Sequence, residues 1–182
     1  MSSNVHPVAS SWSRRRGVLL PFGNSTCNSA SHRGISAFFS DFTQQLERAE
    51  TRKLTARLEL FQRKFPQSTL SVFITELPPR AAVADYAFWL ANRVRFSDVE
   101  AVGTHDFDFV LAIDTHAGAA ALTAGYGLDN RVAEEDLAAA LEAGRAAFAV
   151  NDWASGIEQC VHGFTERLRT IARRARSRTR RL

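Results

Sequence analysis

The chain has 182 residues and a mass of 20.2 kDa, which is enough for one domain and too short for two of ordinary size. Its 45% hydrophobic and 23% charged residues are typical of a globular protein and exclude a fibrous or wholly disordered one. The net charge of +4 is unevenly distributed: residues 1–40 hold four Arg and no acid, residues 41–166 hold 19 acids against 11 bases, and residues 167–182 hold eight Arg and no acid. The body is therefore acidic, which argues against nucleic-acid binding by the folded domain.

Residues 1–37 are rich in Ser, Asn, Gly and Arg and show no periodicity. A run of three Arg at 14–16 precedes an apolar run at 17–22, which is shorter than the core of a secretory signal peptide. Three interpretations stay open: a disordered leader, a misplaced start, or a targeting segment. The lack of a clear signal peptide favours the cytoplasm, and no apolar stretch approaches the length of a membrane span.

The first half of the domain alternates between helical and extended patterns. A helix is predicted from Ser40 or Asp41, either of which can cap it, to the residue before Pro66. A β-branched and aromatic run at 69–75 predicts a strand, and residues 81–95 predict a second helix. The apolar positions expected to face the core in the first helix are Phe42, Leu46, Leu54, Leu58, Phe61 and Phe65.

The second half opens with two strands, predicted at 107–113 and 119–126 and joined as a hairpin by a turn at 115–118. Glu134, Glu135 and Asp136 crowd the start of an Ala-rich helix, where acids oppose the helix dipole. Asn151 or Asp152 is expected to cap the last helix. Its buried stripe is predicted to be Trp153, Ile157, Cys160, Val161, Phe164, Leu168 and Ile171.

This order of elements predicts an α/β fold. The expected architecture is a small mixed β-sheet with a βαβ unit and a hairpin, with helices packed on both faces as in a Rossmann-like sandwich. The predicted organisation is a leader at 1–37, the α/β domain at 38–171 and an Arg-rich flexible tail at 172–182. The two cysteines, Cys27 and Cys160, are too few for a disulfide framework or a four-ligand zinc site, and Cys160 is expected to be a buried thiol.

Four acidic residues form the candidate metal site. A hairpin turning at 115–118 pairs Asp106 and Asp108 with residues 125–129, so that Asp129 is expected beside them and Glu134 nearby. Converging carboxylates repel one another, and a divalent cation such as Ca²⁺ or Mg²⁺ relieves that repulsion. The alternative is that these are solvated acids of loops and of a helix start.

Two motifs resemble the TPM-domain family. Gly125-Tyr126-Gly127-Leu128-Asp129 is similar to the family's Gly-Tyr-Gly-Leu followed by an acid, and residues 151–157 resemble its acidic-aromatic-x-x-Gly helix start. The resemblance runs over about residues 40–170. It implies a TPM-like α/β fold, an acidic crevice that binds a divalent metal and, for some members, weak acid-phosphatase activity.

By position, the resemblance assigns Asp106 to the acid before the second strand, Asp129 to the acid after the Gly-Tyr-Gly-Leu motif and Glu134 to a frequent Asp. The chain departs from the family where Asp106-Phe107-Asp108 replaces Asp-Asn-Gly. Many members are extracytoplasmic, with a signal peptide and a C-terminal membrane span, and neither is evident here.

The sequence therefore supports two functions. The first is a cation-binding TPM-like domain with weak metal-dependent phosphatase activity, and the second is a non-catalytic adaptor in membrane-protein assembly or repair. The Arg-rich C-terminus is expected to meet a protein partner or an anionic membrane surface, or to serve only as a solubilising tail.

Overall fold

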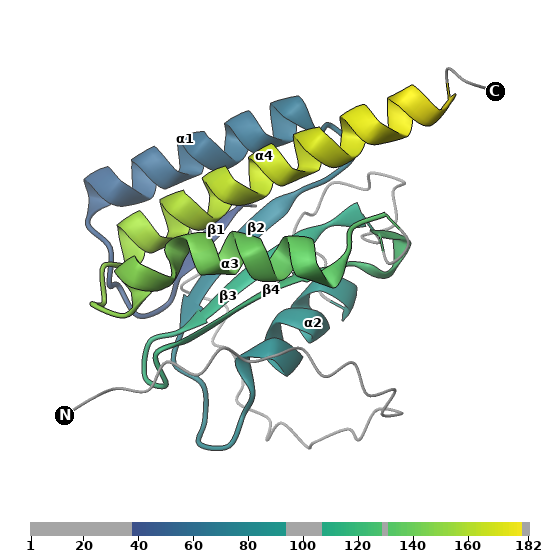
Figure 1. Ribbon diagram of the computed structural model, residues 1–182. Coiled ribbons are helices and arrows are strands. Elements are labelled where there is room, and N and C mark those ends of the chain that lie inside the picture. The colour runs from purple at the N-terminus through teal and green to yellow at the C-terminus, as the bar shows by residue number, and fades with distance from the viewer. Residues whose placement is uncertain (1–37, 94–106, 129–130, 180–182) are drawn as a thin grey trace.

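The computed structural model describes residues 38–93, 107–128 and 131–179. The predicted leader at 1–37 lies outside these residues, as do Asp106 and Asp129 of the candidate site. In chain order the strands and α-helices are β1 (Phe39–Asp41), α1 (Arg48–Lys64), β2 (Leu70–Thr75), α2 (Val83–Arg93), β3 (Phe109–Asp114), β4 (Ala119–Ala124), α3 (Glu134–Phe148) and α4 (Trp153–Thr179), shown in Figure 1. A short 3-10 helix at Tyr126–Leu128 follows β4.

The four strands form one mixed sheet in the order β1-β2-β3-β4. The strands β1, β2 and β3 are parallel, and β4 pairs antiparallel with β3 in the register Leu111↔Leu122. Because β2 and β3 are parallel neighbours joined through α2, the predicted βαβ unit is confirmed, and so is the hairpin with its turn at 115–118.

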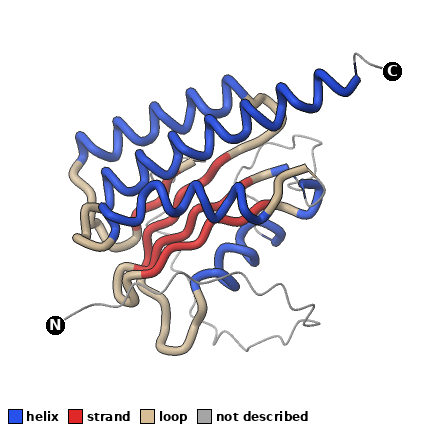
Figure 2. Tube along the Cα trace, viewed as in Figure 1, coloured by secondary structure: helices blue, strands red, loops and turns tan. Residues whose placement is uncertain are grey.

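Helices cover both faces of the sheet, as predicted. Of the described helices, α2 packs on one face and α1, α3 and α4 pack on the other (Figures 1 and 2). The side chains of β3 alternate accordingly, so that Val110 and Ala112 are buried with α2 while Leu111 and Ile113 are buried in the larger core. The α/β fold class is therefore confirmed.

The first helix begins later than predicted. Residues around Ser40 and Asp41, expected to cap that helix, belong instead to β1, where Val72 N donates to Phe38 O at 2.8 Å and Phe42 N donates to Ile74 O at 2.9 Å. A three-residue strand carries little pattern of its own, and its hydrogen bonds come from β2, some thirty residues further along the chain.

The capping of α1 explains its observed start at Arg48. The Glu47 amide donates to the Glu50 carboxylate at 2.8 Å, so a glutamate near the helix start satisfies a backbone donor that has no partner within the helix. The predicted end before Pro66 is close to the observed end at Lys64.

The last helix is longer than predicted. Its buried stripe is confirmed from Trp153 to Leu168, and Ile171 is partly buried against the same core. Residues beyond 171, predicted as a flexible tail, continue the helix to Thr179. The segment contains no Gly or Pro that would end a helix, and Arg and Ala are strong helix formers. Among the described helices, none is long and apolar enough to cross a membrane.

Candidate functional site

The β3–β4 hairpin builds one corner of the molecule, which consists of residues 107–108 before β3 and 125–128 after β4. Phe109 pairs with Ala124, and one step further the Gly125 amide donates to the Asp108 carbonyl at 2.8 Å. The predicted pairing of Asp108 with the residues after β4 is therefore correct. This hydrogen bond fixes where the chain enters and leaves what we call the β3–β4 corner.

Asp108 also connects the corner to the neighbouring strand. Its Oδ1 accepts a hydrogen bond from the backbone amide of Thr69 at 3.0 Å, immediately before β2. The carboxylate thus satisfies a donor at the amino end of a parallel strand. Asp108 therefore has a structural role at this edge, whatever else it binds.

The segment after β4 is held from two sides. On the α2 side, the Tyr126 amide donates to the Asn92 side-chain carbonyl at 3.3 Å, and the Tyr126 and Phe88 rings meet edge to face with centroids 5.5 Å apart. On the core side, Leu128 and Val132 are buried, and the Val132 amide donates to the Leu128 carbonyl at 3.0 Å. The backbone around the Gly-Tyr-Gly-Leu motif is thus anchored by packing and by hydrogen bonds.

Glu134 is the first residue of α3 and is exposed. It stands with Glu135 and Asp136 in the first turn, where the partial positive charge of the helix stabilises carboxylates. Asp136 is held by Arg167 of α4, whose Nη1 lies 2.9 Å from its Oδ1. Glu134 therefore extends into solvent from a helix start that is itself fixed against α4.

The structure describes two of the four predicted metal ligands. It places Asp108 at the β3–β4 corner and Glu134 at the start of α3, which follows the same loop. The other two, Asp106 and Asp129, lie outside the described residues. Within the described ranges, no three His, Cys, Asp or Glu side chains come together in a way that could hold a metal ion. A metal site here would therefore need carboxylates beyond Asp108 and Glu134.

The sequence did not single out Asp114, a buried carboxylate at the opposite edge of the sheet. Its side chain is only 3% exposed, and Oδ1 accepts from the amides of His116 at 3.1 Å, Ala117 at 3.3 Å and Leu77 at 3.4 Å. An aspartate directly before a turn is the signal that could have indicated this role. Asp114 thus organises the hairpin turn and the chain after β2.

Asp41 does the same at the end of β1. Its two oxygens accept from Thr43 and from the Leu46 amide, each at 3.0 Å. Asp41 and Asp114 are the last residues of parallel strands, and the carboxyl ends of such strands are a common location for ligand sites. Here both carboxylates are engaged by nearby donors, so their arrangement serves the loops.

A small hollow lies between α1 and α4. It measures about 20 Å³ and is lined by Arg57, Leu60, Phe61, Lys64, His162 and Thr165. That volume suits a single water molecule. Cys160 lies in the nearby core without a disulfide partner, as expected, and burial raises the pKa of its thiol to about 12. Neither feature offers a substrate pocket or a reactive nucleophile.

Comparison with solved structures identifies the fold. The N-terminal domain of a protein from P. gingivalis superposes with a TM-score of 0.59 at 16% identity, covering 71% of this chain and 80% of that one. The N-terminal domain of cg2496 from Corynebacterium glutamicum gives 0.55 at 14% identity, covering 75% and 83%. BA42 from the psychrophilic bacterium Bizionia argentinensis gives 0.58 at 9% identity, covering 71% and 86%.

The chain shares the fold of these bacterial domains. At such low identity the likeness concerns the fold alone. The sequence matches no family model and no curated protein.

Proposed function

We propose that the chain is a TPM-like domain that binds a divalent cation, Ca²⁺ or Mg²⁺, at the β3–β4 corner. The ligands would be Asp106, Asp108, Asp129 and Glu134. The observation that carries the proposal is the hydrogen bond from Gly125 to Asp108, because it brings together the two chain segments on which these acids lie. The shared fold and the two motifs of the sequence support the family assignment.

The chemistry of the donors fits a hard cation. Carboxylate oxygens are the ligands that Ca²⁺ and Mg²⁺ prefer, and the Thr69 amide already orients the carboxylate of Asp108. When bound, such a cation polarises a phosphoryl oxygen and lowers the pKa of a bound water. Arg131 is exposed and lies between Leu128 and the start of α3. Its positive charge could attract an anionic phosphomonoester to the corner.

Calorimetric titration with Ca²⁺ and with Mg²⁺ tests the cation site. We expect binding by the wild type and its loss in Asp106→Asn/Asp129→Asn. The control is Glu59→Gln/Asp85→Asn, which removes the same charge from exposed positions of α1 and α2 and should bind as the wild type does. A wild type that binds neither cation, or equal losses in both double variants, would overturn the proposal.

Hydrolysis of a phosphomonoester by the same proteins tests the weak phosphatase activity. Hydrolysis that requires the cation and disappears in Asp106→Asn/Asp129→Asn would support an enzyme. Cation binding without cation-dependent hydrolysis would instead support an interaction module.

The second candidate function is this non-catalytic interaction module, which would dock on a protein or on an anionic membrane surface. The specific observation in its favour is the basic end of α4. The Arg-rich segment is helical to Thr179 and is the continuation of α4, whose earlier part packs against the core. A flexible tail would leave the orientation of a docked body undefined, whereas a continuous helix fixes it.

A further inference from the structure

Charge changes abruptly along α4. Glu166 is the last acid of the chain, and the sixteen residues that follow it contain eight Arg. The first two of these are paired: Arg167 with Asp136 at 2.9 Å and Arg169 with Glu166 at 2.6 Å. Up to this point the helix therefore has local carboxylates to balance its cations.

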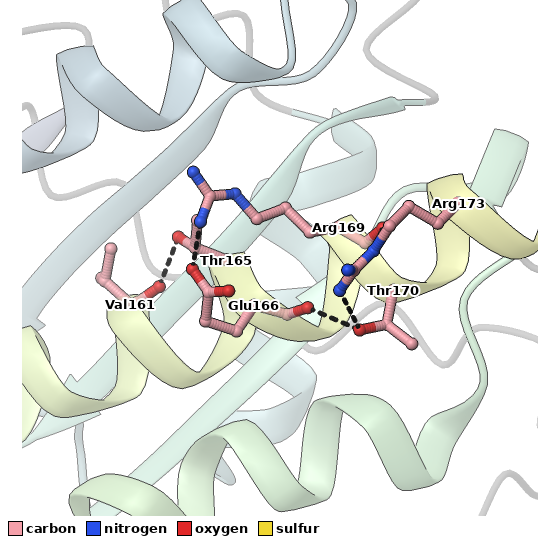
Figure 3. A network of polar contacts seen from close by, with 6 residues as sticks. All are labelled: Val161, Thr165, Glu166, Arg169, Thr170 and Arg173. Atoms are coloured by element: carbon pink, nitrogen blue, oxygen red, sulfur yellow. Dashed lines mark hydrogen bonds and ion pairs between the residues drawn. The ribbon is translucent and has the colours of Figure 1, made fainter.

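The arginines after Arg169 differ from Arg167 and Arg169 in their partners. The Arg173 guanidinium donates to the Thr170 hydroxyl at 3.3 Å and to the Arg169 carbonyl at 3.4 Å (Figure 3). Neither Arg173 nor Arg174 forms an ion pair within the described part of the chain, and both are exposed. Their charges are therefore available to an outside anion.

The same segment leaves the body of the molecule. Helices α1 and α4 lie side by side and run in the same direction, since Lys53 contacts Glu158 at 2.6 Å and the Phe61 ring stacks on Phe164 further along. Helix α1 ends at Lys64, whereas α4 continues to Thr179, and Figure 1 shows its yellow end extending past α1. We call residues 172–179 the basic arm, about 12 Å long at the usual rise of an α-helix.

The apolar stripe of α4 fades along the basic arm. Leu168 is buried and Ile171 is partly buried, but the next positions of the stripe are Ala172, which is half-buried, and Ala175, which is exposed. The basic arm itself, residues 172–179, contains no large apolar residue that could insert into an apolar groove or a bilayer core. Contact through the basic arm would therefore be electrostatic.

We infer that the basic arm binds the anionic surface of a phospholipid bilayer, with headgroup phosphates as the ligands of Arg173 and Arg174. The inference rests on the second proposed function and is independent of the cation site. A guanidinium binds a phosphate through two parallel hydrogen bonds.

The structure favours a bilayer over a nucleic acid. One turn of duplex DNA is about 34 Å, much longer than the arm, so a duplex lying along α4 would also face the acidic start of α3. Glu134, Glu135 and Asp136 stand there, next to Arg167. After Glu166 the chain contains no aromatic residue to stack on bases and no Asn or Gln to read them.

Co-sedimentation with vesicles tests the inference. The full chain is mixed, with EDTA present, with vesicles of phosphatidylcholine alone or of equal parts phosphatidylcholine and phosphatidylglycerol. We expect binding only to the anionic vesicles, weakening as salt is raised. The variant Arg173→Gln/Arg174→Gln should bind roughly 25-fold more weakly, since each Arg at such a surface contributes about a factor of five.

The matched control is Arg48→Gln/Arg52→Gln. It removes the same charge from exposed positions at the start of α1, which is the end of that helix farther from the basic arm. It should bind like the wild type. Gln is a strong helix former, and circular dichroism will show whether each variant keeps its helix content. Equal losses in the two variants would overturn the inference, because they would show a response to net charge alone.

Three further outcomes would also overturn it. The first is a wild type that ignores anionic vesicles. The second is vesicle binding that requires Ca²⁺ and survives Arg173→Gln/Arg174→Gln, which would point to bridging by the β3–β4 corner and so leave the cation site standing. The third is duplex DNA bound at least as tightly as the vesicles at the same salt concentration, which would make nucleic acid the partner.

Discussion

Gly156 of α4 lies directly against the ring of Phe148 of α3, so closely that a Cβ at position 156 would overlap the ring. Gly144 of α3 in turn faces the backbone of Gly156, and a Cβ there would overlap its carbonyl oxygen. These contacts set how near α3 and α4 approach. Gly156 lies in the segment 151–157 noted in the sequence, and here that glycine has a packing role.

Gly156→Ala should therefore destabilise the fold. The added methyl must displace a buried aromatic ring, and overpacking of this kind costs about 1–3 kcal/mol, against a gain of up to about 1 kcal/mol in helix propensity. Gly163→Ala is the control, since its Cβ would lie 3.2 Å from the Ala143 Cβ and needs only a small adjustment. Urea denaturation of both variants measures the difference, and equal stabilities would contradict this account.

Asp114→Ala should be costly because three backbone amides lose a buried acceptor. We expect the free energy of unfolding to fall by about 2–3 kcal/mol. Asp114→Asn keeps an acceptor oxygen at the same place and should lose clearly less. If alanine and asparagine were equally tolerated, the role assigned to this carboxylate would be wrong.

Cys160 should be chemically silent in the folded protein. Burial raises the pKa of its thiol to about 12, so at pH 8 the reactive thiolate is scarce as well as inaccessible. In a Cys27→Ser background, a thiol reagent such as DTNB should react with Cys160 only after urea unfolds the chain. Rapid reaction in the absence of urea would show that α4 opens locally.

Glu158 should contribute to stability in a pH-dependent way. The hydrogen bond from Lys53 and the charge of Arg57 lower the pKa of its carboxyl group, although burial acts in the opposite direction. A pKa that is lower in the folded state stabilises the protein above the unfolded value of about 4.3, and this contribution is lost as pH falls through the folded pKa.

Glu158→Gln should thus cost less than about 1 kcal/mol at pH 7, because the pair is largely exposed, and progressively less as the pH falls below about 4. Thermal denaturation across this range checks the expected convergence. Glu59→Gln, which removes a more exposed carboxylate 3.9 Å from Arg63, should change little at either pH. A deficit that persists at low pH would exclude the ion pair as its cause.

The fold was largely predictable because its long elements are strongly periodic. The stripe from Trp153 to Leu168 buries one face of a long helix, and the apolar run of β3 is buried on both faces of a central strand. Such patterns can be recognised without knowledge of the partner. The strand β1 was missed for the opposite reason. Phe39–Asp41 is too short for a period, and Phe42 and Leu46 fall by chance at helical spacing from the true helix.

The candidate site was predictable only in part. The hairpin register follows from turn length, so the pairing of Asp108 with Gly125 could be counted from the turn. The Thr69 amide that engages the Asp108 side chain lies 39 residues away, and no local pattern connects the two. The roles of Asp114 and Asp41 likewise depend on which amides the folded chain brings to them.

The sequence by itself determined the α/β class, the parallel β2–β3 pair, the hairpin and the separation of an acidic body from a basic C-terminus. These follow from local periodicity, turn chemistry and composition, which act over a few residues. Only the tertiary structure decided that β1 joins the sheet, that Asp114 is buried and held by backbone donors, and that the Arg-rich end is a helix extending past α1. Each of these depends on contacts between residues distant in the chain or on the continuation of a helix that the core supports.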